Sequence, residues 1–311
     1  MSKKICFLSF AFLIFTKSFS QDPFFINTDQ SIIYLNPSFA GSNGGIRNQF
    51  TYRNQWPNTS GNYVTFVNSL DFYLPKVKGG ISVLALHDDQ AHGTLKTEKL
   101  SLGYAQQLSL FDGKLKLIPS LQLSYFEKNL DTRKLNFGSY INPRRGFAWS
   151  PYTIPNTKKQ NIDFSAGLLS NYKNFYLGTA IFHINQPDEG LLGVSKLPYR
   201  LLIHSSYNLH VSEKTVFNLF ARFEKQQNFE GLSLNMKALL FKHLILGAGC
   251  TSDNLANFNF GYRNNFFVVS LGYDMSKFRL LDNYTGSWEF MASFNLRNKE
   301  QRKTLTDFEK W

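Results

Sequence analysis

The residues of this chain that come closest to a metal-binding arrangement form one short polar stretch, His87-Asp88-Asp89-Gln90-Ala91-His92. Imidazoles and carboxylates are ligands that zinc and calcium use. Gly93 follows directly, and a polar run that ends in glycine between two apolar segments is typical of a solvated hairpin loop. We therefore predict a turn here, and no metal or cofactor.

The remaining candidates for catalysis are scattered. No serine or cysteine stands in a nucleophile-elbow pattern, and the sequence has no glycine-rich phosphate loop. His183, His204, His210 and His243 are isolated from one another, and His204 falls on the polar face of an expected strand. A serine and a histidine on neighbouring strands would escape a search by spacing. The sequence nonetheless predicts a protein that is not an enzyme.

The start of the chain predicts export. Lys3 and Lys4 precede the apolar run Ile5 to Phe15, and small residues follow at Ser18 and Ser20. This order is typical of a secretory signal peptide, which we assign to residues 1–20. The sequence has no second run of about 20 apolar residues, so an exported chain with a role in a membrane must span it as a closed β-barrel.

The composition agrees with a barrel. The formal charge of +12 falls to +9 without the three lysines of the predicted signal peptide. The basic residues are scattered singly, which favours a barrel lining and rims that face anionic outer-membrane lipid, and no nucleic acid. Only Cys250 remains after the leader, so no internal disulfide can form. Aromatic residues make up 16% of the chain, as suits strands whose outer face meets lipid.

Strand periodicity is clearest near the C-terminus, where Trp288, Phe290 and Phe294 alternate with Glu289 and Ser293. A two-residue period indicates a strand whose faces meet different surroundings. Similar stretches predict fourteen strands at about 45–56, 62–73, 78–87 (a mixed pattern), 94–108, 114–127, 161–171, 173–185, 197–210, 215–226, 230–241, 243–251, 255–263, 266–275 and 286–296.

The lengths of the connections test this count. The long connections, 129–160, 186–196 and 276–285, are the fifth, seventh and thirteenth in order. The even connections are short, except that Leu74–Val77 is somewhat longer. Outer-membrane barrels alternate short turns with longer surface loops in this way. We predict an all-β fold, a single-chain antiparallel transmembrane β-barrel of the outer-membrane type. About fourteen strands are favoured, with twelve or sixteen left open, and both termini are periplasmic.

The domain plan has four parts: a signal peptide at 1–20, an N-terminal segment at 21–44, the barrel at 45–297 and a polar, charged tail at 298–311. Asn36, Pro37 and Gly41 suit tight turns, so the second part is either a strap or plug inside the barrel or a disordered periplasmic lead. The polar strand faces carry candidate lining residues that would suit an anion-selective pore: Arg47, Arg53, Arg200 and Arg263.

The longest loop, 129–160, is a candidate partner-binding site. It holds Arg144, Arg145, Phe147 and Trp149, and arginine with aromatic residues is common in binding hot spots. A solvated loop without a partner is the alternative.

Several stretches of the chain resemble the PorP/SprF family of type IX secretion system membrane proteins of Bacteroidota. They include Tyr34-Leu35-Asn36-Pro37-Ser38-Phe39-Ala40-Gly41, Tyr52-Arg53-Asn54-Gln55-Trp56-Pro57, Leu197-Pro198-Tyr199-Arg200 and Gly286-Ser287-Trp288-Glu289. The resemblance covers nearly the whole mature chain. The charged tail after Leu296 departs from barrels that end on an aromatic residue.

The resemblance implies an outer-membrane component of the type IX secretion and gliding system without catalytic residues. Its expected partner is a secreted, adhesin-like protein, bound through a C-terminal targeting domain for export and surface anchoring. Periplasmic components of the system, including a peptidoglycan-binding lipoprotein, are further expected partners. A passive outer-membrane pore for small, anionic solutes is the alternative function.

Overall fold

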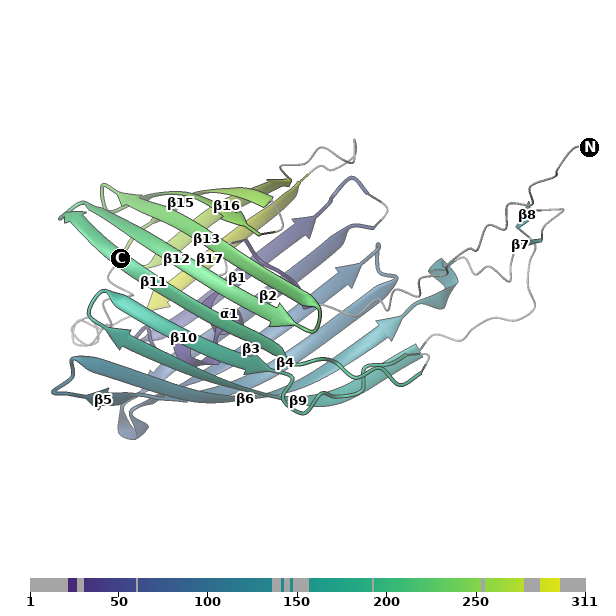
Figure 1. Ribbon diagram of the computed structural model, residues 1–311, viewed down its shortest axis with the longest axis horizontal. Coiled ribbons are helices and arrows are strands. Elements are labelled where there is room, and N and C mark those ends of the chain that lie inside the picture. The colour runs from purple at the N-terminus through teal and green to yellow at the C-terminus, as the bar shows by residue number, and fades with distance from the viewer. Residues whose placement is uncertain are drawn as a thin grey trace, which may run out of the picture.

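Alternating apolar and polar residues give this chain long strands, and a computed structural model shows how they assemble (Figure 1). The structure describes residues 22–26, 31–59, 61–135, 141–142, 146–147, 157–191, 193–252, 255–276 and 286–296. The predicted signal peptide and the polar tail lie outside these residues. The barrel strands are β1 Ile46–Gln55, β2 Tyr63–Leu74, β3 Gly79–Gln90, β4 Leu95–Gln106, β5 Leu108–Leu110, β6 Leu115–Leu130, β9 Thr157–Tyr172, β10 Phe175–Phe182, β11 Arg200–Ser212, β12 Thr215–Gln226, β13 Phe229–Leu240, β14 Leu244–Thr251, β15 Leu255–Arg263, β16 Phe267–Ser276 and β17 Ser287–Leu296.

These strands form one closed antiparallel barrel. Each strand pairs with its neighbours in chain order, and β4 and β5 follow one another along β6 as a single staggered strand. The barrel closes where β1 pairs with β17, from Ile46 opposite Leu296 to Gln55 opposite Ser287. The predicted fourteen-strand barrel is therefore confirmed.

The two faces of the wall differ as the sequence predicts. In β17, Trp288 and Phe294 are exposed on the outside, whereas Ser287 and Glu289 are buried in the lumen. An outer face of exposed apolar side chains suits lipid, and an inner face of polar side chains suits the lumen. No helix among the described residues is long and apolar enough to cross a membrane.

Six short helical or strand elements among the described residues lie outside the wall. In the described part of the chain, the one α-helix is α1 (Ile32–Leu35), followed by the 3-10 helix η1 (Pro37–Phe39), both before β1. Two further 3-10 helices, η2 (Pro75–Val77) and η3 (Thr132–Lys134), lie in connections. In the long connection after β6, β7 (Ile141–Asn142) pairs with β8 (Gly146–Phe147).

The structure corrects the boundary of the third strand. β3 runs to Gln90, so His87, Asp88 and Asp89 belong to the strand, and the turn begins at Ala91. Asp88 points into the lumen, where it accepts hydrogen bonds from Thr65 Oγ1 (2.6 Å) and Gln90 Nε2 (2.8 Å). Among the described residues, no three histidine, cysteine or acidic side chains gather where they could hold a metal ion.

The connection between β6 and β9 is shorter than predicted. β6 extends to Leu130 and β9 begins at Thr157, and the two strands pair over their full length. Their ends carry charged side chains on both faces, as in Lys158 paired with Glu127 (2.7 Å). Charges on both faces hide the two-residue period, which explains why the sequence pattern assigned these residues to the loop.

Candidate functional site

The segment before β1 lies inside the barrel rather than beside it. Every residue from Ser31 to Gly45 is buried, and α1 sits within the ring of strands (Figure 1). We call residues 22–26 and 31–44 the N-terminal strap. Its first and second parts are both held by lumen-facing side chains of the wall, as the contacts below show.

Apolar packing holds one side of the strap. Its buried apolar side chains include Ile33, Leu35 and Phe39, each at most 1% exposed. They share one core cluster with lumen-facing residues of the wall, including Leu84, Leu86, Ala105, Ile118, Leu169 and Tyr176. Burying a side chain of this size contributes about 1.5–3 kcal/mol.

β3 is apolar on both faces because its outer face meets lipid and its inner face meets the strap, which accounts for its mixed sequence pattern.

A buried ion pair anchors the strap near the short-turn opening. Arg47 of β1 binds Asp71 of β2 with both ends of its guanidinium, Nε–Oδ1 and Nη2–Oδ2 each at 2.8 Å. The same two residues bind the strap: Arg47 Nη2 donates to the carbonyl of Phe39 (3.1 Å), and Asp71 Oδ2 accepts from the amide of Gly41 (2.9 Å). The pair therefore joins two strands and the turn after η1.

The backbone of the same turn packs directly against the backbone of β3. Gly41 has a φ of +68°, which side chains rarely adopt. A Cβ atom on Gly80 of β3 would lie 2.1 Å from the carbonyl oxygen of Ala40. Only glycine at position 80 leaves room for the strap backbone at this point.

Asn36 holds the middle of the strap. Its Oδ1 accepts from the amide of Ser38 (2.9 Å), and its Nδ2 lies 3.1 Å from the carbonyl oxygen of Thr179 and 3.1 Å from His204 Nε2. Gly167 faces this amide, since a Cβ there would lie 2.3 Å from Asn36 Oδ1. The histidine that the sequence left as a polar lining residue thus contacts the strap.

The strap ends at the opposite opening of the barrel. Asp22 Oδ2 lies 2.8 Å from His183 Nε2 and 3.2 Å from Arg200 Nη1, and both cations stand where β10 and β11 meet the long loop between them. Leu296 lies at the short-turn opening, opposite Ile46. Both chain ends lie outside the described residues, so the placement of both termini on the turn side stays a prediction. Within the described residues, Asp22 and Leu296 lie at opposite openings. The reason is the apolar strap, which runs through the lumen.

Neighbouring charges shift the pKa values of ionisable groups at the long-loop opening. Burial of the His183 ring opposes its charged form, but Asp22 and Asp163 outweigh burial and raise the pKa of His183 above its usual value. Burial likewise works to raise the pKa of Asp22, but His183 and Arg200 hold it well below its usual range. In the loop between β10 and β11, Lys159 and two backbone amides lower the pKa of Asp188 to about 2.

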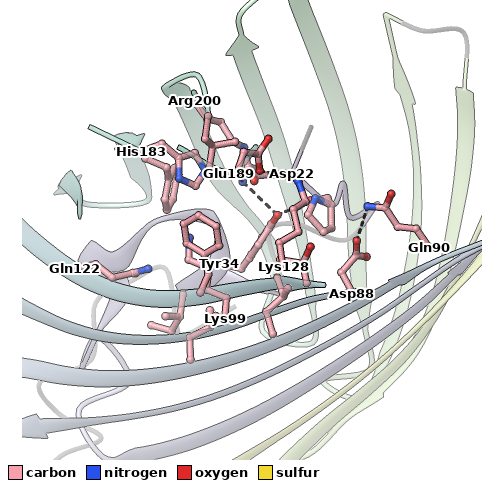
Figure 2. Close-up of a pocket in the computed structure, with 18 residues that line it drawn as sticks. Asp22, Tyr34, Asp88, Gln90, Lys99, Gln122, Lys128, His183, Glu189 and Arg200 are labelled. Atoms are coloured by element: carbon pink, nitrogen blue, oxygen red, sulfur yellow. Dashed lines mark hydrogen bonds and ion pairs between the residues drawn. The ribbon is translucent and has the colours of Figure 1, made fainter. Parts of the chain in front are cut away.

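A small pocket opens beside Asp22. It has a volume of about 60 Å³ and lies between the strap, the wall and the loop after β10. Arg200, His183 and Asp22 lie together on one side of it (Figure 2). Lys128 pairs with Glu189 of the loop at 2.7 Å, and both line the pocket.

The predicted lining arginines have different surroundings. Arg47, Arg53 and Arg200 are buried in the lumen, and each is ion-paired: Arg53 Nη2 lies 2.7 Å from Asp274 Oδ2 of β16 and its Nη1 lies 3.5 Å from Glu289 Oε2 of β17. Glu289 also accepts from the strap amide of Ile26 (2.7 Å). Arg263 is half-buried at the short-turn end of β15.

The predicted partner-binding residues are not described. Arg144, Arg145 and Trp149 lie outside the described residues, and Phe147 is described only as part of β8. The residues that sequence reasoning missed are Asp22, Asp71, Gly80 and His183. Of these four residues, only Asp71 had a signal in the sequence, because it lies on the polar face of an expected strand. The structure places it opposite Arg47 of the preceding strand.

The barrel is similar to solved outer-membrane barrels of very different sequence. The TodX deltaS2S3 mutant monoaromatic hydrocarbon channel aligns with a TM-score of 0.51 at 12% identity, over 85% of this chain and 94% of that chain. The Acinetobacter baumannii outer membrane protein Omp33 gives 0.48 at 8% identity, over 81% and 98%. A Pseudomonas aeruginosa FadL homologue gives 0.47 at 10% identity, over 86% and 94%.

At such low identity these similarities concern the fold alone, and no curated protein matches the sequence. The family comparison is more specific. Residues 17–294 match the family described as type IX secretion system membrane protein PorP/SprF, and the chain therefore belongs to that family.

Proposed function

We propose that this outer-membrane barrel binds a secreted, adhesin-like partner through the partner's C-terminal targeting domain and anchors it at the cell surface. The observation that carries the proposal is the strap. A lumen crossed by a buried segment of the chain suits a binding scaffold, whereas a diffusion pore needs open, hydrated space. The family supports the secretion-system setting.

The buried charges favour binding over passage of anions. Arg47, Arg53 and Arg200 are each paired with a carboxylate, so they offer little net positive charge to a permeating solute. We retain the passive pore as the alternative, and single-channel recording distinguishes the two: the proposed scaffold stays silent in a planar bilayer. No catalytic step forms part of the proposal.

We propose that the partner is held at the long-loop opening. The loop after β6 carries Arg144, Arg145, Phe147 and Trp149, which suit an acidic or carboxylate-bearing surface. Periplasmic components of the secretion system, including a peptidoglycan-binding lipoprotein, would then meet the short-turn opening. The exposed apolar outer face would contact outer-membrane lipid.

Replacing Arg144, Arg145 and Phe147 together by alanine is expected to leave the barrel inserted and to release the secreted partner into the medium. Two arginine anchors of about 1–2 kcal/mol each weaken capture by tens of fold or more. The measurement compares partner on the cells with partner in the medium. Arg133→Ala is the control, because Arg133 is 79% exposed and pairs with its neighbour Asp131. Wild-type retention by an inserted triple variant would exclude this loop as the capture site.

The proposed orientation has its own test. An epitope inserted at Pro155 is expected to bind antibody on intact cells, because the long connections face outward in the proposal. An epitope at Asp112–Gly113, in the tight turn between β5 and β6, is expected to stay hidden until the outer membrane is opened. The reverse labelling would invert the orientation of the barrel.

A further inference from the structure

The end of the strap carries a carboxylate that the barrel holds in the manner of a ligand. Asp22 Oδ2 accepts from Arg200 Nη1 at 3.2 Å and lies 2.8 Å from His183 Nε2. The side chains of Arg200 and His183 are 2% exposed, whereas that of Asp22 is 20% exposed. The two cationic groups are thus built into the wall, and the carboxylate reaches them from the side of the opening.

The cationic groups keep their positions through contacts that do not involve Asp22. Arg200 Nε donates to Glu224 Oε1 at 2.7 Å, and its guanidinium lies 5.1 Å from the ring centroid of Tyr34 and 5.3 Å from that of Phe182. His183 Nδ1 lies 2.9 Å from Asp163 Oδ2. Removal of the Asp22 carboxylate would therefore leave a preformed site.

Arg200 also has an unused hydrogen-bond donor. Its Nη2 atom is buried and has no hydrogen-bond partner among the described residues. Arg200, His183 and Asp22 line the same 60 Å³ pocket, to which Glu189 and Leu197 of the loop after β10 also contribute (Figure 2). A buried guanidinium nitrogen without a partner is costly, and a second carboxylate oxygen would satisfy it.

The local charges show how another anion could enter. Lys99 and His183 share Asp163, and Arg200 and Arg222 share Glu224. With Asp22 present, the cationic groups are nearly balanced, so a second anion gains little. Without Asp22 they outnumber their carboxylates, and an incoming carboxylate would restore the balance. These charges favour exchange over addition.

Asp22 can leave without disturbing the rest of the strap. Beyond the two cationic groups, its further described hydrogen bond runs from its amide to Gln226 Oε1 (3.2 Å). The next residue, Pro23, accepts a bond from the Tyr34 hydroxyl at its carbonyl (2.6 Å). Segments with few buried contacts open locally at low free energy. Residues 31–44 stay in place through their own core and ion pair.

We propose that Arg200 and His183 form a carboxylate-binding site whose resident ligand is Asp22, and that a carboxylate of a bound peptide displaces Asp22 there. The peptide reaches the site from the long-loop opening, in which respect the inference rests on the proposed function. Displacement exchanges one ion pair for another and releases Asp22, while the rest of the strap stays in place.

The test uses Asp22→Gly protein in detergent with sodium acetate as the probe. Acetate is expected to raise the temperature at which half of the protein loses its folded gel mobility, with half-saturation on the order of millimolar. Sodium chloride at equal ionic strength should not do so. Asp22→Asn is the matched control, because its amide fills the site and should abolish the response. The wild type should respond only at far higher acetate, because tethered Asp22 competes for the site at a high effective concentration.

The response must also depend on the cationic groups. Adding Arg200→Gln, or His183→Asn if that variant does not insert, should remove the effect of acetate. An acetate effect equal in Asp22→Gly and Asp22→Asn, or no effect in Asp22→Gly, would overturn the site. This outcome is independent of the partner. If acetate binds as expected but no secreted protein is retained by cells, the proposed function fails and the carboxylate site stands.

Discussion

Gly80→Ala is expected to displace the strap from the lumen while leaving the wall of the barrel intact. The added Cβ would lie 2.1 Å from the carbonyl oxygen of Ala40 and 2.5 Å from the amide nitrogen of Gly41. These are backbone atoms, so no side-chain rotation relieves the clash, and overpacking of this kind costs about 1–3 kcal/mol or more. Alanine is no worse than glycine for β3 itself.

The measurements are planar-bilayer conductance and thermal stability of the folded barrel. We expect channel openings and a lower melting temperature for Gly80→Ala, and wild-type behaviour for Gly61→Ala, where a Cβ meets no atom within 4 Å. In a variant that lacks residues 31–43, Gly80→Ala should change neither quantity, because the clashing atoms are gone. A silent, fully stable Gly80→Ala barrel would contradict the described position of the strap.

Asp71→Ala is expected to destabilise the barrel by about 3–5 kcal/mol, because the Arg47 guanidinium stays buried after the Asp71 carboxylate is removed. Arg47 is 5% exposed and Asp71 is fully buried. The loss also removes the acceptor for the Gly41 amide, so the strap loosens together with the wall. Denaturant unfolding in lipid vesicles measures the change in free energy.

Two comparisons isolate the cause of that loss. The double variant Arg47→Ala with Asp71→Ala should lose less than the sum of the single variants, since it leaves no uncompensated charge. Glu230→Ala removes one side of the exposed pair between Lys225 and Glu230, and its effect on stability should be small because solvent screens an exposed pair. Equal losses for Asp71→Ala and Glu230→Ala would show that the buried pair has no special role.

The wall of the barrel was predictable because each strand carries its own evidence. Trp288 and Glu289 are neighbours in sequence and lie on opposite faces, so the two-residue period alone reports the difference between lipid and lumen. The pattern failed at the ends of β6 and β9, where both faces carry charges, and in β3, where the inner face meets the strap. Leu84 and Leu86 are apolar because they meet the strap, and no local period could indicate this.

The site was less predictable because its contacts join distant parts of the chain. Asn36 suggested a tight turn, and it does accept from Ser38, but nothing nearby in sequence pointed to His204. His183 was isolated in the sequence and Asp22 had no signal there, but the strap brings the two side chains together. Such pairings depend on the path of the strap through the lumen, which packing decides.

The seam between β1 and β17 has a consequence for the order of assembly. Every other pairing in the wall joins strands that are neighbours in the chain, so those hairpins can form as their residues become available. The seam joins the first strand to the last, and Arg53 meets Asp274 and Glu289 only across it. Ile26 of the strap binds the same Glu289. Ring closure and strap docking therefore involve the same group of charges. A barrel that closes without the strap in its lumen lacks the hydrogen bond from Ile26 to Glu289 at the seam.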